Sequence, residues 1–266
     1  MPVTKIASWN INSVRARIDI VSDFLTQVAP DVLCLQETKV DDPTFPHEPF
    51  ERLGYVHRLL AGQRMHHGVA ILSRLPLHAH GRHDWQDNGE ARHVGACLPN
   101  GIRLENVYVP AGGDVPDPEL NVKFAHKLQF LSETADWFTA KRQRKRPMIL
   151  VGDLNIAPLE HDVWSHKQLL KVVSHTPIEV EHLGRLQKTL GWVDAIRHFV
   201  PETEKLYSWW SYRNRDWAAS DRGRRLDHIW VTPALAGGLR EHHVARAVRG
   251  WEPATDHVPV TATLEL

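Results

Sequence analysis

Short apolar runs recur along the whole chain, and no Gly- or Ser-rich linker separates them. Runs of this length, bounded by turn residues, are typical of buried β-strands. Pro99, Asn100 and Gly101 stand between two of these runs and predict a β-hairpin. The predicted strands cover residues 5–11, 31–38, 55–61, 67–73, 93–98, 102–110, 148–155, 206–213, 224–232, 242–248 and 257–266.

Two longer segments carry apolar residues at helical spacing. The first helix is predicted to begin after Ser13, as its N-cap, and to end at Pro30. The second is predicted from about Pro118 to Lys141. A basic run at 141–146 follows, which we interpret as the charge complement of the helix dipole, with phosphate binding as the alternative. The apolar face of the first helix is Val14, Ile18, Val21, Leu25 and Val28.

The two halves of the chain are parallel in outline, because each begins with a strand, a polar loop and a helix. This order predicts an α/β fold: a four-layer α/β sandwich in which two packed mixed β-sheets are flanked by helices. A length of 266 residues is enough for one domain with a large core, so we expect residues 1–266 to form a single domain.

The composition is that of an ordinary soluble protein, with 42% apolar and 24% charged residues. The sequence has no stretch near the ~20 apolar residues that span a bilayer and no N-terminal signal pattern, so we expect a cytoplasmic protein that does not enter a membrane. Cys34 and Cys97 lie in apolar runs and are predicted to be reduced thiols. The basic and acidic residues number 32 each, so the net charge indicates nothing about a polyanionic partner.

Polar residues stand at the ends of the apolar runs. A lone buried carboxylate costs several kcal/mol unless it is paired or binds a cation. Each residue alone has an ordinary explanation, as a turn former, a cap or a surface ion pair, but the same pattern recurs at strand after strand. The residues concerned are Asn10, Asn12, Glu37, Tyr108, Asp153, Asn155, Asp227, Asp256 and His257.

The donor types indicate the kind of metal. Carboxylate and amide oxygens dominate the set, and such sites suit Mg²⁺ or Mn²⁺. Mg²⁺ held by few carboxylates usually works beside substrate phosphates. The residues therefore predict a metal-assisted hydrolase that acts on phosphate esters.

The chain resembles the exonuclease III family of AP endonucleases, within the larger endonuclease/exonuclease/phosphatase group. The resemblance is carried, in order, by "SWNINSVRAR", "LQETK", "HGVAILS", "VYVPAGG", "GDLNIAP", "YSWWSYR", "RGRRLDHIWVT" and "TDHVPV", and it covers residues 5–266. It implies the same sandwich fold, with Mg²⁺ as cofactor and Mn²⁺ as a substitute. The implied activity is cleavage 5′ to abasic sites, together with removal of nucleotides or blocking groups from 3′ ends of double-stranded DNA. The implied protein is a monomer.

The resemblance also implies roles for particular residues. Asp153 would orient or deprotonate the attacking water, and Asn155 would hold the phosphate. His257 would donate to the same phosphate and be oriented by Asp227, while Tyr108 would lie near the leaving oxygen. The implied metal ligands are Asn10, Glu37, Asp153, Asn155, Asp256 and His257.

For DNA, the resemblance implies an aromatic pocket made by Trp209 and Trp210, of which Trp210 is expected to be the more buried. The other implied DNA-binding residues are Asn12, Arg15, Lys39, Arg213, Arg224 and Leu226.

Two residues depart from the family pattern. Ala111 stands where relatives carry an amide that reaches the phosphate, and Arg224 stands where they often carry Trp or Leu in the pocket. Two alternatives remain open at this point: a phosphoesterase of the same group that acts on lipid or inositol phosphates, and a DNA-binding relative without activity.

Overall fold

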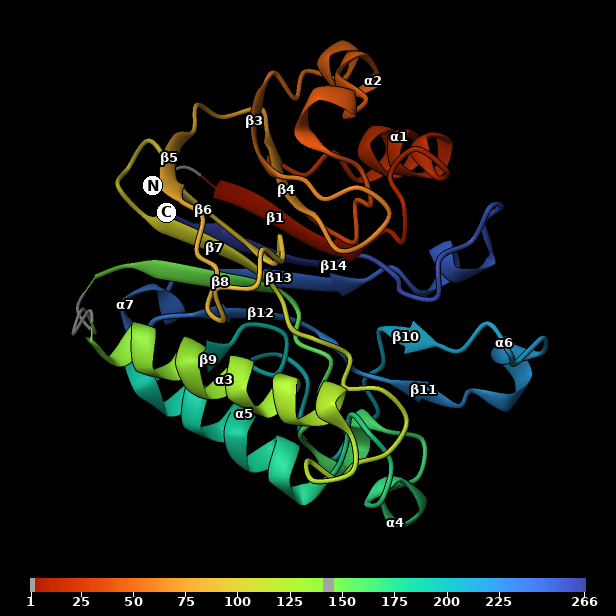
Figure 1. The fold of residues 1–266 in the computed structure, drawn as a ribbon. Coiled ribbons are helices and arrows are strands. Elements are labelled where there is room, and N and C mark those ends of the chain that lie inside the picture. Colours follow the sequence, from red (N-terminus) through yellow and green to blue (C-terminus); the bar gives the residue numbers. More distant parts are fainter. Residues whose placement is uncertain (1–2, 141–145) are drawn as a thin grey trace.

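The computed structural model describes residues 3–140 and 146–266. Two six-stranded sheets pack face to face in this part of the chain, and helices cover their outer faces (Figure 1). The predicted four-layer α/β sandwich is therefore confirmed. None of the helices in the described ranges has the length and apolar composition needed to cross a bilayer.

The first sheet has the order β13-β14-β1-β2-β4-β3. Its strands β1 and β2 run parallel, and the other neighbours run antiparallel. The strands are β1 (Val3–Asn10), β2 (Val32–Gln36), β3 (His57–Ala61), β4 (Val69–Ser73), β13 (Leu239–Val244) and β14 (Val260–Glu265).

The second sheet has the order β5-β6-β7-β8-β12-β9, and its one parallel pair among the described strands is β7 and β8. The strands are β5 (His78–Gly81), β6 (His93–Cys97), β7 (Arg103–Tyr108), β8 (Met148–Asp153), β9 (Val193–Asp194) and β12 (Asp227–Val231). A separate two-stranded ribbon consists of β10 (Trp209–Trp210) and β11 (Gly223–Arg224).

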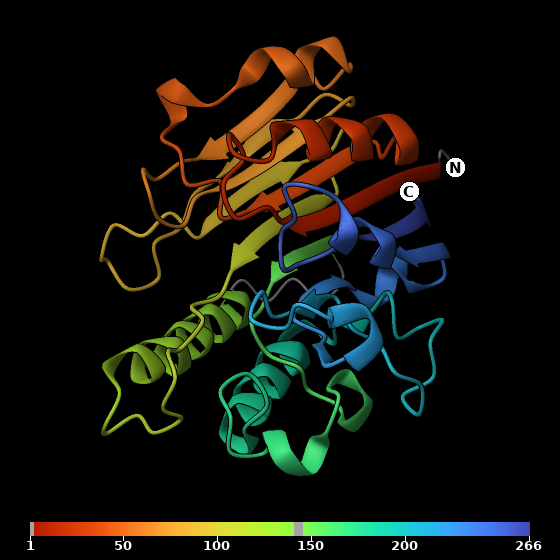
Figure 2. The same ribbon diagram turned by 90° about the vertical axis from the view of Figure 1, so that its right-hand side faces the viewer.

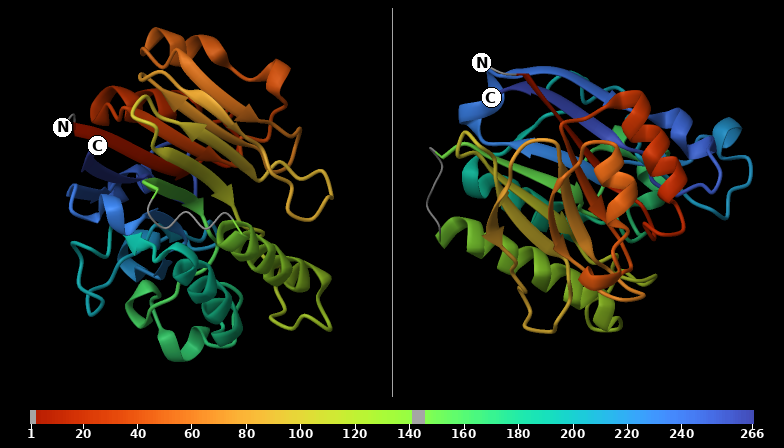
Figure 3. Two further views of the ribbon diagram at one scale, coloured as in Figure 1. Left: turned by 90° about the vertical axis from the view of Figure 1, so that its left-hand side faces the viewer. Right: turned by 90° about the horizontal axis from the view of Figure 1, so that it is seen from above.

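The helices are arranged on both sides of the sheets. Figure 3, seen from above, shows the first two helices over the first sheet, and Figure 1 shows α3 and α5 under the second. The α-helices are α1 (Ile18–Val28), α2 (His47–Arg52), α3 (Val122–Ala140), α4 (His166–Leu169), α5 (Pro177–Leu190), α6 (Trp217–Ser220) and α7 (Pro233–Ala236). The described ranges also contain the short 3₁₀-helices η1 (Asp42–Thr44), η2 (Glu160–Asp162) and η3 (Arg246–Gly250).

Strand alternation explains the layers, because successive side chains of a strand point to opposite faces. In β2, Val32 and Cys34 lie in the core between the two sheets, whereas Leu33 and Leu35 pack under α1 and α2. A third apolar cluster fills the space between the second sheet and α3 and α5. Both faces of the central strands are thus buried, which is why the sequence shows continuous apolar runs there.

Several local predictions can be compared with the structure. The hairpin at 99–101 joins β6 to β7, as predicted, and Cys34 and Cys97 are free thiols. Ser13 as N-cap of the first helix is wrong: α1 begins at Ile18, and Ser13 has a positive φ of 88° while its amide donates to the Glu37 carbonyl. Of the strand predicted over 206–213, only β10 (Trp209–Trp210) is a strand in the structure. All of the basic run except Arg146 lies outside the described residues.

Candidate active site

The polar strand ends meet at one edge of the sandwich, where the packing of the two sheets brings them together. Asn10 ends β1, and Glu37 directly follows β2. Tyr108 ends β7 and Asp153 ends β8, while Asp227, opposite Asp153 in the antiparallel register, begins β12. The β10–β11 ribbon and α6 project beyond this edge, and Figure 2 views the molecule from that side.

The backbone is specialised at these ends. Glu37 and Asn155 have positive φ values of 52° and 54°, a left-handed conformation that is uncommon for residues other than glycine. Gly152 lies so close to β7 that a Cβ atom would stand 1.8 Å from the Val107 carbonyl oxygen. A side chain at position 152 would therefore push β8 away from β7 and displace Asp153.

Glu37 is an ionised carboxylate at the pocket wall. Its Oε1 accepts hydrogen bonds from Asn10 Nδ2 at 2.9 Å and Tyr108 Oη at 2.7 Å. Lys39 Nζ lies 2.8 Å from Oε2. Burial opposes the charge, but the hydrogen bonds from Asn10 and Lys39 outweigh it and lower the pKa of Glu37 to about 2.

Asp153 and Asn155 are joined in a tight local arrangement. Asp153 Oδ1 accepts from the Asn155 amide at 2.9 Å, and Oδ2 accepts from Asn10 Nδ2 at 2.9 Å. Asn155 Nδ2 donates to the Val109 carbonyl at 2.9 Å and to Asp153 Oδ2 at 3.2 Å. Burial raises the pKa of Asp153 to about 7, although the nearby His257 partly offsets this effect.

His257 is held by Asp227. The ring Nδ1 lies 2.8 Å from Asp227 Oδ2, and the same oxygen accepts from Ser208 Oγ at 2.6 Å. Nε2 is thereby directed toward Asp153 Oδ2, 3.6 Å away. Burial lowers the pKa of His257, but the charge of Asp227 outweighs it and raises the pKa well above its usual value.

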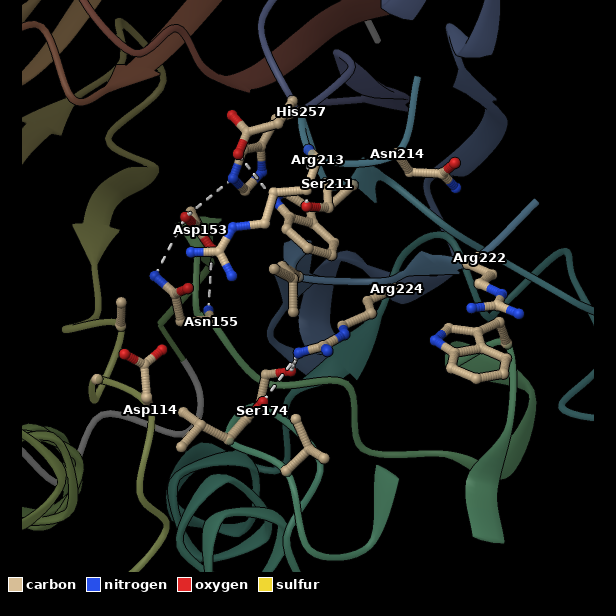
Figure 4. Close-up of a pocket in the computed structure, with 18 of the residues that line it drawn as sticks. Asp114, Asp153, Asn155, Ser174, Ser211, Arg213, Asn214, Arg222, Arg224 and His257 are labelled. Atoms are coloured by element: carbon tan, nitrogen blue, oxygen red, sulfur yellow. Dashed lines mark hydrogen bonds and ion pairs between the residues drawn. The ribbon is translucent and has the colours of Figure 1, made fainter. Parts of the chain in front are cut away.

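These groups open into a cavity of about 770 Å³ (Figure 4). Glu37, Tyr108, Asp153, Asn155 and His257 all line it, so residues from four separate segments share one space. The remaining lining residues include Ala111, Asp114, Trp164, Val173, Ser174, Trp209, Arg213, Arg222, Arg224, Leu226 and Asp256.

The structure separates the two tryptophans. Trp209 lines the cavity, whereas Trp210 is 1% exposed and packs with Tyr207 and Val258. Trp210 is the more buried of the pair, as expected, and does not belong to the cavity wall. Trp209 Nε1 donates to Asp256 Oδ2 at 2.9 Å, so the Asp256 carboxylate is bound to the tryptophan.

Three of the other predicted DNA-binding residues lie outside the cavity lining. Lys39 pairs with Glu37, and Asn12 donates to Tyr212 Oη at 3.2 Å. Arg15 is exposed in the loop before α1. By contrast, Arg213, Arg224 and Leu226 line the cavity.

Ser174 and Trp164 line the cavity but carried no signal in the sequence. Both lie in the segment between β8 and α5, where the sequence shows neither strand alternation nor a polar strand end. Arg224 Nη1 reaches Ser174 Oγ at 2.7 Å across 50 residues of chain. A contact of that kind follows from the fold and not from local spacing.

The donor set fits a hard divalent cation. Asp153, Asp227 and His257 offer ligand atoms within 4.8 Å of one another, and Asn10 links Asp153 to the ionised Glu37. Asp227 Oδ1 is buried without a hydrogen-bond partner among the described residues. A carboxyl group as buried as Asp153 needs nearby positive charge to ionise, and a cation beside Glu37 would supply it. Oxygen donors of this kind suit Mg²⁺ or Mn²⁺ better than a structural Zn²⁺.

Comparisons with known proteins agree with this geometry. Residues 7–257 match the model of the endonuclease/exonuclease/phosphatase family. Exodeoxyribonuclease III of Haemophilus influenzae is 32% identical over 97% of this chain and 98% of its own. An AP endonuclease from Archaeoglobus fulgidus superposes with a TM-score of 0.91 at 31% identity, over 99% of this chain and 100% of that one. The 3′ phosphatase NExo from Neisseria, bound to a product DNA hairpin, gives 0.90 at 31% identity with the same coverage.

Proposed function

The chain belongs to the endonuclease/exonuclease/phosphatase family and to its exonuclease III group of AP endonucleases, and on that premise we propose a Mg²⁺-dependent DNA-repair activity. The enzyme is a hydrolase and a nuclease. The specific reactions that we propose are cleavage of the phosphodiester 5′ to abasic sites, 3′-5′ removal of nucleotides, and release of blocking groups from 3′ ends of duplex DNA.

One observation carries the proposal: an ionised Glu37, a buried Asp153 and an oriented His257 line the same cavity as Trp209. The carboxylates supply the charge that a divalent cation needs, and the imidazole supplies a donor for phosphate. An aromatic wall beside them suits a baseless sugar turned out of the duplex. A phosphoesterase for lipid headgroups is less well supported, because the similar proteins named above are nucleases or DNA 3′-end enzymes.

Glu37 would hold the metal, with Asn10 beside it. When bound, Mg²⁺ would stabilise charge on the phosphate oxygens and make water a better nucleophile. Tyr108 would keep Glu37 in place through its 2.7 Å hydrogen bond and lie near the leaving oxygen.

Asp153 would orient the attacking water and accept its proton. Its position beside the metal and the acidity that the metal gives to water would make this possible, since the basicity of a carboxylate is modest. Asn155 Nδ2 would exchange its longer, 3.2 Å hydrogen bond to Asp153 for one to a phosphate oxygen as negative charge grows there, a contribution of about 3–4 kcal/mol in comparable sites. His257 would donate Nε2–H to the same phosphate, because its Nδ1 is engaged by Asp227.

DNA would lie across the cavity mouth, with Arg213 against a backbone phosphate and Trp209 against the flipped sugar. Arg15, Asn12 and Lys39 would contact DNA outside the cavity, through the loop before α1 and the loop after β2. We further propose that residues 1–266 act as one catalytic domain and as a monomer, because the four segments that line the centre come from the same chain.

The test compares turnover on three duplexes: one with an abasic site, one with a recessed 3′ end and one with a 3′-phosphate. We expect cleavage of all three with Mg²⁺ and none in the presence of a chelator. Asp153→Ala, with unchanged circular dichroism, should abolish all three activities. Equal rates with chelator, or full activity of Asp153→Ala, would refute the proposed mechanism.

A further inference from the structure

We propose that Arg224 makes the enzyme prefer substrates that carry a second negative charge. This charge is an oxyanion on the group that is esterified to the scissile phosphate and occupies the cavity. This inference rests on the proposed function and adds the class of substrate. In the hydrolysis, water adds to phosphorus, the bond to the DNA 3′ oxygen breaks, and that oxygen takes a proton. The phosphate that is cut from the 3′ oxygen stays bonded to the group in the cavity, which is the abasic sugar or a small blocking group.

The backbone places Arg224 close to the phosphate position. Trp209 pairs with Arg224 in the β10–β11 ribbon and forms a bridge with His257 on its other side. Opposite residues of antiparallel strands have Cα atoms about 5 Å apart, so the row from His257 to Arg224 spans roughly 10 Å. A guanidinium group from Arg224 is therefore within reach of a group esterified to a phosphate held by His257.

The guanidinium is fixed by specific contacts. Nη1 donates to the Val173 carbonyl at 2.9 Å and to Ser174 Oγ at 2.7 Å, while Cζ lies 5.2 Å from the centre of the Trp209 ring. Nε is buried and has no hydrogen-bond partner among the described residues. Figure 4 shows the side chain reaching from β11 across the cavity toward Ser174.

The contacts of Arg224 are a carbonyl, a hydroxyl and an aromatic ring, and the acid whose charge acts on it, Glu179, is paired with Lys127. Leu226 and Val172 pack in one apolar cluster with Trp209, and Ala111 adds no polar side chain to the cavity. Arg213 and Arg222 also line the cavity but are exposed residues, so Arg224 is the more enclosed cation. The acids Glu37, Asp153 and Asp256 are committed to the contacts described above, and Asp114 is an exposed residue of the lining.

This environment favours one kind of substrate. An oxyanion beside Arg224 gains charge-assisted hydrogen bonds, which are about twice as strong as neutral ones. A neutral sugar or alkyl group gains none and removes water from a guanidinium that is already partly desolvated. Two sources share the required chemistry: a carboxylate on a 3′-terminal blocking group, and the DNA phosphate that follows an abasic sugar.

Two matched substrate pairs test the inference. The first pair is a duplex with a 3′-phosphoglycolate end and the same duplex with a neutral 3′-(2-hydroxyethyl phosphate) end. The second pair is an abasic-site duplex with a normal phosphate after the abasic sugar and one with a neutral methylphosphonate there. We expect kcat/KM about tenfold higher for the charged member of at least one pair, which corresponds to about 1.4 kcal/mol. A preference in the first pair identifies the carboxylate of the blocking group as the partner of Arg224. A preference in the second pair identifies the phosphate after the abasic sugar as that partner.

The variants connect the preference to the residue. Arg224→Met should bring the ratio close to one, and Arg224→Lys should keep part of it. Arg185→Met is the control, because Arg185 is an exposed arginine that pairs with Asp136 on the outer helices, and it should keep the full ratio. If Arg224→Met fails to fold, Arg224→Lys makes the same connection, because its ratio should fall below that of the wild type.

Ratios below threefold in both pairs, or a ratio that Arg224→Met leaves intact, would overturn the inference. In that case, cleavage of the neutral substrates would leave the proposed nuclease function standing. Failure of the wild type to cleave any of the four duplexes would overturn both.

Discussion

Lys127 Nζ lies 2.6 Å from Glu179 Oε1, and both side chains are fully buried between α3 and α5. The same ammonium group donates to the Asn155 carbonyl at 2.8 Å and to the Ala111 carbonyl at 3.3 Å. Glu179 accepts in turn from the Ser174 amide at 2.9 Å. One buried ion pair thus joins the outer helices to three segments of the cavity wall.

Lys127→Met should therefore destabilise the fold and weaken catalysis together. Removing one partner of a buried pair leaves the other charge uncompensated, at a cost of about 3–5 kcal/mol. Urea unfolding should show this loss, and the double variant Lys127→Met/Glu179→Gln should recover part of it. Lys171→Met, on an exposed side chain, is the control. If Lys127→Met is as stable as the wild type, the ion pair of Lys127 with Glu179 does not stabilise the fold.

Asp227→Asn tests the orientation of His257. The carboxylate holds Nδ1 at 2.8 Å, so its loss removes the charge that fixes the ring with Nε2 toward the cavity. We expect kcat to fall by roughly 10- to 100-fold with little change in KM, as for partners of other catalytic groups. Steady-state kinetics on an abasic duplex would measure this. Asp23→Asn, at an exposed position of α1, should behave like the wild type. A 10- to 100-fold rise in KM without loss of kcat would indicate that Asp227 acts in substrate binding instead.

Acid sensitivity should arise from a buried cluster behind the cavity. Arg225 lies 2.8 Å from Asp162 and 2.6 Å from Asp194. Burial alone would raise the pKa of both carboxyl groups, but Arg225 outweighs it and lowers the pKa of each. Their stabilising contribution is complete above the unfolded-state pKa of about 3.9 and is lost as the pH falls below it.

Asp194→Asn should thus cost about 3–5 kcal/mol of unfolding free energy at pH 7. The difference from the wild type should shrink below pH ~4, because the carboxylates of the unfolded wild type take up protons there while the folded state keeps them ionised. Denaturant titrations at pH 7, 5 and 3 would show the trend. A difference that is constant across this range would mean that the carboxylate charge is not the stabilising element.

The sequence predicted a metal site from acids and amides because polar residues recur at the ends of its apolar runs. Glu37 follows β2 and Asp153 ends β8, and the packing of the two sheets, which local patterns do not determine, brings these two ends to one edge. The sequence could not predict the contact of Arg224 with Ser174, because Ser174 lies outside any periodic segment and the loop between β8 and α5 sets its distance from the strand of Arg224. The residue type of Ser13 suits a helix cap, yet the Glu37 carbonyl binds its amide instead.

Glu37→Gln tests the proposed metal site most directly. The pKa of Glu37 is about 2, so the wild-type side chain is charged at any pH at which DNA is intact, and the amide removes that charge with little change in shape. Asn10 and Tyr108 can still donate to the amide oxygen, whereas the amide nitrogen would face Lys39, so the fold of the variant is checked by circular dichroism. We expect activity to fall on the order of 10²-fold at 1 mM Mg²⁺, with partial recovery at higher concentrations, because a hard cation loses its charged ligand. Activity titrated against Mg²⁺, with Mn²⁺ binding measured by calorimetry, separates the affinity for the metal from the turnover rate.

Glu48→Gln, at an exposed position of α2, is the control and should leave both curves unchanged. A Glu37→Gln enzyme with the wild-type Mg²⁺ dependence would place the metal elsewhere, and Asp153 with Asp227 would then be the remaining acids able to hold it.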